Sequence, residues 1–94
     1  MFIVRETFTA KPGKASALAA LFKQVMSEVP RLKPRVSTDF IGTFNTVVLE
    51  TEAEDLADFE KTMQEYMSRQ DLRDKMKGYT DLYQEGRREV FKIV

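Results

Sequence analysis

The sequence contains no cysteine, no histidine and no tryptophan. Without cysteine or histidine the chain has no usual zinc ligands, no His or Cys ligand for haem, no thiol nucleophile and no Ser-His-Asp triad. The absence of cysteine is also typical of a reducing compartment. No apolar run approaches the roughly 20 residues of a membrane-spanning helix, and the first residues lack a signal-peptide pattern. We therefore expect a cytoplasmic protein with no metal, no cofactor and no membrane partner.

Neither sign of charge is in excess, because 15 basic residues balance 15 acidic ones among the 94 residues. A neutral chain lacks the basic surface that nucleic-acid binding requires, so no nucleic-acid partner is expected. The length indicates a single domain over residues 1–94. Surface scaling predicts a folded area of roughly 5,600 Å² and a modest core, which a second subunit would stabilise.

Hydrophobic periodicity divides the chain into alternating strands and helices. The clearest helix spans residues 14–29, where one apolar stripe recurs at helical spacing: Leu18, Leu21, Phe22, Val25, Met26 and Val29. Runs rich in β-branched and aromatic residues predict strands at 2–9, 35–41, 46–51 and 87–94.

A second helical region lies between the third and fourth predicted strands. Residues 51–54 (Thr-Glu-Ala-Glu) match a capping box, which predicts that Thr51 caps the helix that follows. A further helical piece after Ser68 is expected to end or bend at Gly78. The order β-α-β-β-α-β, with this extra helix, predicts an α+β ferredoxin-like fold: a four-stranded antiparallel sheet with its helices on one face.

A short turn at residues 43–44 would pair Phe40 with Val47, Thr38 with Leu49, and Val36 with Thr51. We assign this mostly apolar set to the face of the sheet that the helices cover. The other face then receives the alternate residues: Arg35, Ser37, Asp39, Ile41, Thr46, Val48 and Glu50, joined by Arg5 and Thr7.

Apolar residues nevertheless fall on both faces of the predicted sheet, because Val48 opposes its neighbours Val47 and Leu49, and Ile3 opposes Val4. Two helices cover only one face, so a second copy of the chain is the economical cover for the other, and we expect a homodimer. The alternative is a monomer with a partly apolar open face.

The candidate site residues are polar groups on or near this second face. Asp39 and Glu50 are candidate general bases, and Arg5 or Arg35 could bind an anionic oxygen. Alternatively, these four form ion pairs at the edge of the assembly. The predicted ligand-binding set comprises Arg5, Arg35, Ser37, Val48 and Tyr83. Tyr66, Tyr79 and Tyr83 could donate a hydrogen bond to a ligand, or could be core and rim aromatics.

A strand that leads into Lys-Pro-Gly-Lys at 11–14 and then into an amphipathic helix resembles the dimeric α+β barrel superfamily. The closest likeness is to antibiotic biosynthesis monooxygenase-like and NIPSNAP-like domains, whose last strand the segment Gly86–Val94 also resembles. The resemblance implies a homodimer whose two sheets pack into a barrel. It also implies a cleft between sheet and helices that binds hydrophobic ligands in some members.

The sequence departs from the enzymes of that superfamily. Haem-degrading members use a histidine ligand and some polyketide cyclases use a histidine base, and this chain has neither. The monooxygenases often place Trp, Asn and Tyr around an aromatic substrate, but Trp is absent and the only asparagine is Asn45, in the predicted hairpin. The function expected is that of a homodimeric protein that binds a small apolar or aromatic ligand. The alternative is a cofactor-independent monooxygenase that acts on a quinol or a polyketide-like aromatic.

Overall fold

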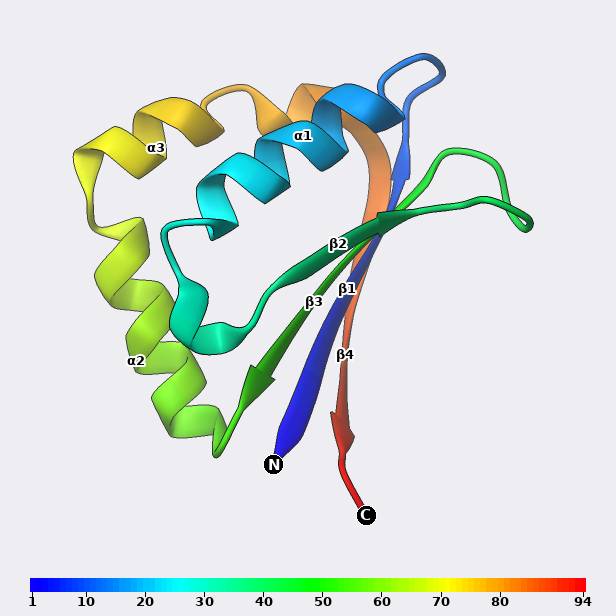
Figure 1. The fold of residues 1–94 in the computed structure, drawn as a ribbon. Coiled ribbons are helices and arrows are strands. Elements are labelled where there is room, and N and C mark those ends of the chain that lie inside the picture. The colour runs from blue at the N-terminus through cyan, green and yellow to red at the C-terminus, as the bar shows by residue number, and fades with distance from the viewer.

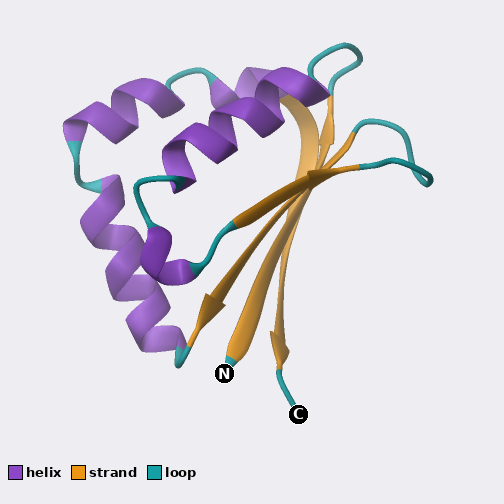
Figure 2. Ribbon diagram, in the orientation of Figure 1, coloured by secondary structure: helices purple, strands orange, loops and turns teal.

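The computed structural model describes all residues from 1 to 94 and shows a four-stranded antiparallel sheet with every helix on one of its faces (Figures 1 and 2). The strands are β1 (Phe2–Ala10), β2 (Arg35–Thr38), β3 (Thr46–Ala53) and β4 (Tyr83–Lys92). The helices are α1 (Ala15–Met26), α2 (Leu56–Met67) and α3 (Gln70–Met76), with single 3₁₀ turns at Pro30–Leu32 and Tyr79–Leu82. The predicted ferredoxin-like order is confirmed. No helix has the length and the hydropathy needed to cross a membrane.

The order of strands in the sheet is β2-β3-β1-β4, so β2 and β4 form the two edges. Antiparallel pairing places Val4 beside Thr51 and Phe8 beside Val47, and these residues face the helices. Helix α1 contributes the predicted stripe, with Leu18 and Phe22 buried against this face. The core is thus confined to one side of the sheet.

The chain enters and leaves α1 through residues that cannot continue a strand or a helix. Gly13 has φ of +79°, a left-handed conformation that glycine adopts without strain, and it turns the chain from β1 towards α1. After Met26 the helix ends, and Pro30 opens a 3₁₀ turn that buries Leu32. The observed helix is therefore shorter at both ends than the predicted helix 14–29. Val29 lies beyond its end but is still fully buried.

The connection between β2 and β3 is longer than the predicted turn. Strand β2 ends at Thr38 rather than residue 41, and the observed pairs are Thr38 with Val47 and Val36 with Leu49. The predicted register was wrong by two residues, because Asp39 closes a wide loop by accepting a hydrogen bond from the Thr46 N–H at 2.9 Å. An even shift leaves each strand residue on its predicted face.

The predicted capping box at 51–54 was also wrong. Thr51 is buried within β3, which continues to Ala53 because Ala53 pairs with Phe2. Asp55 caps α2 instead: its carboxylate accepts a hydrogen bond from the Asp58 N–H at 2.7 Å. The last strand begins at Tyr83 rather than residue 87.

Candidate functional site

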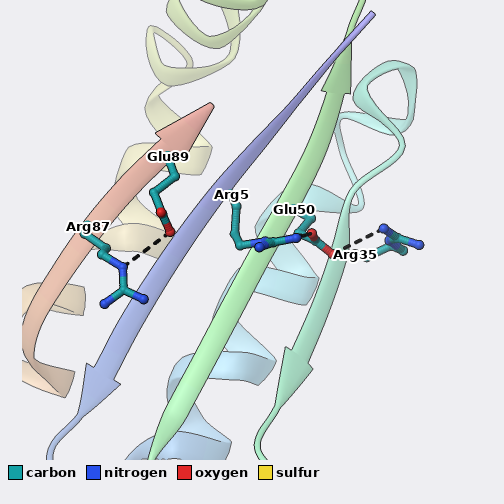
Figure 3. A network of polar contacts seen from close by, with 5 residues as sticks. All are labelled: Arg5, Arg35, Glu50, Arg87 and Glu89. Atoms are coloured by element: carbon teal, nitrogen blue, oxygen red, sulfur yellow. Dashed lines mark hydrogen bonds and ion pairs between the residues drawn. The ribbon is translucent and has the colours of Figure 1, made fainter. Parts of the chain in front are cut away.

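A row of four charged side chains crosses the open face of the sheet, the face without helices (Figure 3). The register places Arg35 beside Glu50, Glu50 beside Arg5, and Arg5 beside Glu89, one residue from each strand. The charges therefore alternate in sign from one edge of the sheet to the other. We call Arg35, Glu50, Arg5 and Glu89 the charged row.

Glu50 is the centre of this row. Its Oε2 accepts a hydrogen bond from Arg5 Nε at 3.0 Å, and its Oε1 accepts one from an Arg35 guanidinium nitrogen at 3.2 Å. The Glu89 carboxylate lies 3.4 Å from Arg87, and the guanidinium of Arg5 also lies 4.9 Å from the ring centre of Phe91. Both oxygens of Glu50 are thus occupied by cations, which favours a structural role over that of a free base.

The structure divides the predicted ligand-binding residues between the two faces. Arg5, Arg35, Ser37 and Val48 lie on the open face, where Ser37 is the cross-strand neighbour of Val48. Tyr83 lies on the helix side, where its ring centre is 4.9 Å from that of Phe8. The five residues therefore do not line one cavity.

The three candidate catalytic residues are also apart from one another. Asp39 holds the β2–β3 loop closed, and Glu50 belongs to the charged row. Tyr66 packs beside the core cluster around Val4, and the guanidinium of Arg69 lies 5.9 Å from its ring centre.

A groove of about 470 Å³ runs between α2 and the helix-facing side of β1 and β4. Its wall is mainly apolar and is formed by Val4, Leu56, Phe59, Met63, Met67 and Val90. The polar residues at its margin are Glu60, Gln64 and Arg88. Unbranched methionine side chains adapt to ligands of different shape, so this wall suits a small apolar molecule.

Arg88, at the margin of this groove, forms an ion pair with Glu6. They are cross-strand neighbours on the helix side, 3.4 Å apart, and the side chain of Glu6 is only 19% exposed. A smaller hollow of about 290 Å³ shares Arg88 with the groove and is also lined by Glu6, Tyr79 and Tyr83. Burial raises the pKa of the Tyr79 hydroxyl and the neighbouring Tyr83 adds to the shift, so this hydroxyl stays protonated and able to donate.

Sequence reasoning missed Glu6 and Arg88. The available signal is the alternation in β1: the helix-facing residues Phe2, Val4, Phe8 and Ala10 are apolar, and Glu6 is the one charged residue among them. A carboxylate at a core-facing position needs a partner, and register with β4 supplies Arg88.

A larger hollow of about 690 Å³ lies where the end of α1 meets β2. It includes Arg35, Ser37 and Glu50 of the predicted set, but only two of its eight lining residues are hydrophobic. Its polar lining suits water better than an apolar ligand, so the groove beside α2 is the stronger candidate site.

No protein-family model matches the chain, and no curated protein matches it in sequence. Solved structures do match its fold. A NIPSNAP family protein of unknown function from Agrobacterium tumefaciens is 16% identical, with a TM-score of 0.85 over 99% of this chain and 87% of its own.

Two other solved structures share this arrangement over nearly their whole length. An uncharacterised NIPSNAP domain protein from Burkholderia xenovorans is 12% identical, with a TM-score of 0.81 over 100% of this chain and 95% of its own. A candidate antibiotic biosynthesis monooxygenase from Deinococcus radiodurans is 13% identical, with a TM-score of 0.70 over 100% of this chain and 93% of its own. The chain therefore has the fold of the NIPSNAP and antibiotic biosynthesis monooxygenase-like domains, as the resemblance in sequence indicated.

Proposed function

We propose that this chain is a homodimeric protein that binds a small apolar or aromatic ligand in the groove between α2 and the sheet. The observation that carries the proposal is the apolar wall of that groove, with Met63 and Met67 on one side and Val4 and Val90 on the other. Arg88 lies at its margin and is exposed enough to bind a second anion beside Glu6. The favoured ligand is therefore an apolar molecule with one acidic or strongly accepting oxygen.

The alternative of cofactor-independent oxygenation requires a base at the groove. Asp39 lies in the β2–β3 loop and Glu50 lies on the open face, so neither predicted base reaches the groove, and the carboxylate that lines it belongs to Glu60 at its margin. No observation favours oxygenation over binding. Oxygen uptake in the presence of quinols would show whether the chain also turns a ligand over.

The ligand proposal is tested with anilinonaphthalene sulfonate, a fluorescent apolar anion. We expect the wild-type chain to bind it and Arg88→Met to weaken binding by about tenfold, because a charge-assisted hydrogen bond is lost. Arg88→Met also leaves Glu6 unpaired, so the double variant Glu6→Gln with Arg88→Met separates folding effects from binding.

The matched control is Arg87→Met, on the same strand but on the open face. It should leave probe affinity unchanged. Equal affinity in the wild type, in Arg88→Met and in Arg87→Met would exclude this groove as the site.

The homodimer is supported by the shape of the chain. The molecule measures 36 × 35 × 18 Å, thin along one axis, and exposes 6290 Å² against roughly 5,600 Å² expected for its mass. The open face of the sheet carries Ile3, Val48 and Phe91 without any helix to cover them (Figure 2). We also propose a cytoplasmic location, which the absence of cysteine supports.

A further inference from the structure

The outer edge of β4 carries backbone groups that pair with no other strand of the sheet. Strand β4 lies at the end of the sheet order and bonds only to β1. The Ile93 N–H donates to the Met1 carbonyl at 2.9 Å, which fixes the alternation of this antiparallel ladder. The odd-numbered residues of β4 therefore bond to β1, and the N–H and C=O groups of Arg88, Val90 and Lys92 point away from the sheet. An extended segment can bond to these groups as an added strand.

The side chains of these same three residues lie on the helix side of β4. Val90 is the cross-strand neighbour of Val4, and Lys92 is the neighbour of Phe2, which shares the face of Val4. A strand added antiparallel to β4 sets its own side chains beside those of the residues with which it pairs. The residue that bonds to Val90 would therefore direct its side chain into the groove between α2 and the sheet.

That groove has an apolar wall beside the free edge. Phe59, Met63 and Met67 of α2 line it opposite Val90. Val90 is 44% exposed and Leu56, at the start of α2, is 45% exposed, so both apolar side chains are incompletely covered. An apolar side chain of an added strand would cover both, which favours an apolar residue opposite Val90.

The charges on either side of Val90 select what flanks that apolar residue. Arg88 and Lys92 are both cations on the helix side of β4, and Arg88 remains 58% exposed although it lies 3.4 Å from Glu6. A second β4 paired about Val90 would place Arg88 beside Lys92 of the partner subunit, and like charges that face each other across strands are destabilising. An added strand with acidic residues at these two positions would form opposite-charge pairs instead.

We propose that the edge of β4 binds an extended acidic peptide segment of a partner protein. The segment pairs antiparallel to β4 and has an acidic residue, any residue, an apolar residue, any residue and a second acidic residue. Its apolar residue bonds to Val90 and fills the groove, and its acidic residues lie opposite Arg88 and Lys92. This inference goes beyond the proposed function, because it uses backbone groups at the sheet edge that a small ligand does not need.

The probe is a fluorescein-labelled peptide, Thr-Glu-Thr-Leu-Thr-Glu-Thr, with both ends blocked, and its binding is followed by fluorescence anisotropy. N-methylation of the leucine removes the N–H that would donate to Val90, so it should weaken binding by about tenfold. N-methylation of the next threonine is the matched control, because that N–H points away from β4 and its loss should change the affinity little. Amide hydrogen exchange at Val90 should slow when the peptide binds, while exchange at Glu89, whose N–H already bonds to β1, should not change.

Charge reversal on β4 tests the acidic positions. Lys92→Glu should weaken binding by about fivefold, and a peptide with lysine in place of the acidic residue opposite it should restore the affinity. Arg87→Glu makes the same change of charge on the same strand but on the open face, so it should affect binding much less.

Three results would overturn the proposal. The first is no binding of the peptide at about 1 mM; if anilinonaphthalene sulfonate still binds, the small-ligand proposal stands without this one. The second is an equal loss of affinity from the two N-methylated peptides, since the segment would then not bond as a strand. The third is binding only at protein concentrations where sedimentation shows a monomer, because a second copy would then occupy the edge in the dimer.

Discussion

Gly86 lies opposite Phe8 in the β1–β4 pair, and the ring of Phe8 covers the place where a side chain would stand. A Cβ atom at Gly86 would lie 2.8 Å from one carbon of that ring. The ring has little room to move, because it packs 5.0 Å from Phe22 and 4.9 Å from Tyr83 between ring centres. Because Gly86 has no side chain, the ring of Phe8 can pack directly against the edge strand β4.

The variant Gly86→Ala should therefore destabilise the protein. Overpacking costs about 1–3 kcal/mol, while replacing glycine returns at most about 1 kcal/mol from the unfolded state, so we expect a net loss of about 1 kcal/mol. Urea unfolding at fixed protein concentration measures it. Adding Phe8→Leu should make the double variant less unstable than the sum of the single ones. Glu85→Ala, exposed on the same strand, is the control, and a Gly86→Ala protein more stable than wild type would contradict the prediction.

Single residues were predictable where their chemistry follows from strand alternation alone. Arg35, Ser37, Val48 and Glu50 were assigned to the face opposite the helices, and they lie there. The role of Glu6 was missed because it depends on the ion pair with Arg88, which lies 82 positions further along the chain. The alternation in β1 marks Glu6 as a charged residue at a helix-facing position, but the identity of its partner is set by the pairing of the whole sheet and not by either local sequence.

At the scale of elements, α2 depends on Asp55 for its start. The Asp55 carboxylate accepts from the Asp58 N–H, and Asp58 in turn forms an ion pair with Arg31. This helix supplies Leu56, Phe59, Met63 and Met67 to the wall of the groove. Its mean hydropathy is low, so capping and packing decide whether its first turn is formed.

We expect Asp55→Ala to lower the free energy of unfolding by about 1 kcal/mol, since a lost N-cap leaves an amide of the first turn without a partner. Urea unfolding gives the overall change, and amide hydrogen exchange shows whether the loss is confined to the first turn of α2. Glu54→Ala is the matched control because Glu54 is exposed and lies just before the cap. An equal effect in both variants would mean that acidic charge near the helix, not the cap itself, is responsible.

The elements themselves were predictable to different degrees. Helix α1 was found because its stripe repeats over three turns and Pro30 limits its extent. The end of β2 was not found, since Phe40 and Ile41 look like strand residues but lie in the loop that Asp39 closes. Two hydrogen bonds between Asp39 and Thr46 outweighed local β-propensity there, because the apolar residues gain little from pairing at an uncovered edge of the sheet.

For the whole molecule, the balance of charge and its arrangement have separate consequences. A chain with 15 basic and 15 acidic residues meets a copy of itself without net repulsion. Specific pairing then depends on where the charges lie, and the charged row concentrates two cations and two anions on the face that lacks helices. Hydrophobic cover from Phe40, Ile41 and Phe44 would supply affinity, while the row would supply the register.

Charge reversal at the centre of the row separates these contributions. Glu50→Arg would place a third guanidinium between Arg5 and Arg35 and make the open face net positive, so two such faces would repel and we expect the dissociation constant of the proposed homodimer to rise by about tenfold or more. Combining Glu50→Arg with Arg5→Glu restores the balance of charge on the open face, so the double variant should recover most of the affinity. Sedimentation at two salt concentrations is the measurement. Salt should weaken the wild-type dimer and strengthen the Glu50→Arg dimer, because it screens attraction in one and repulsion in the other. If Glu50→Arg dimerises as tightly as the wild type at both salt concentrations, then the open face does not lie in the interface and Glu50 acts only within its own chain, through the bonds it accepts from Arg5 and Arg35.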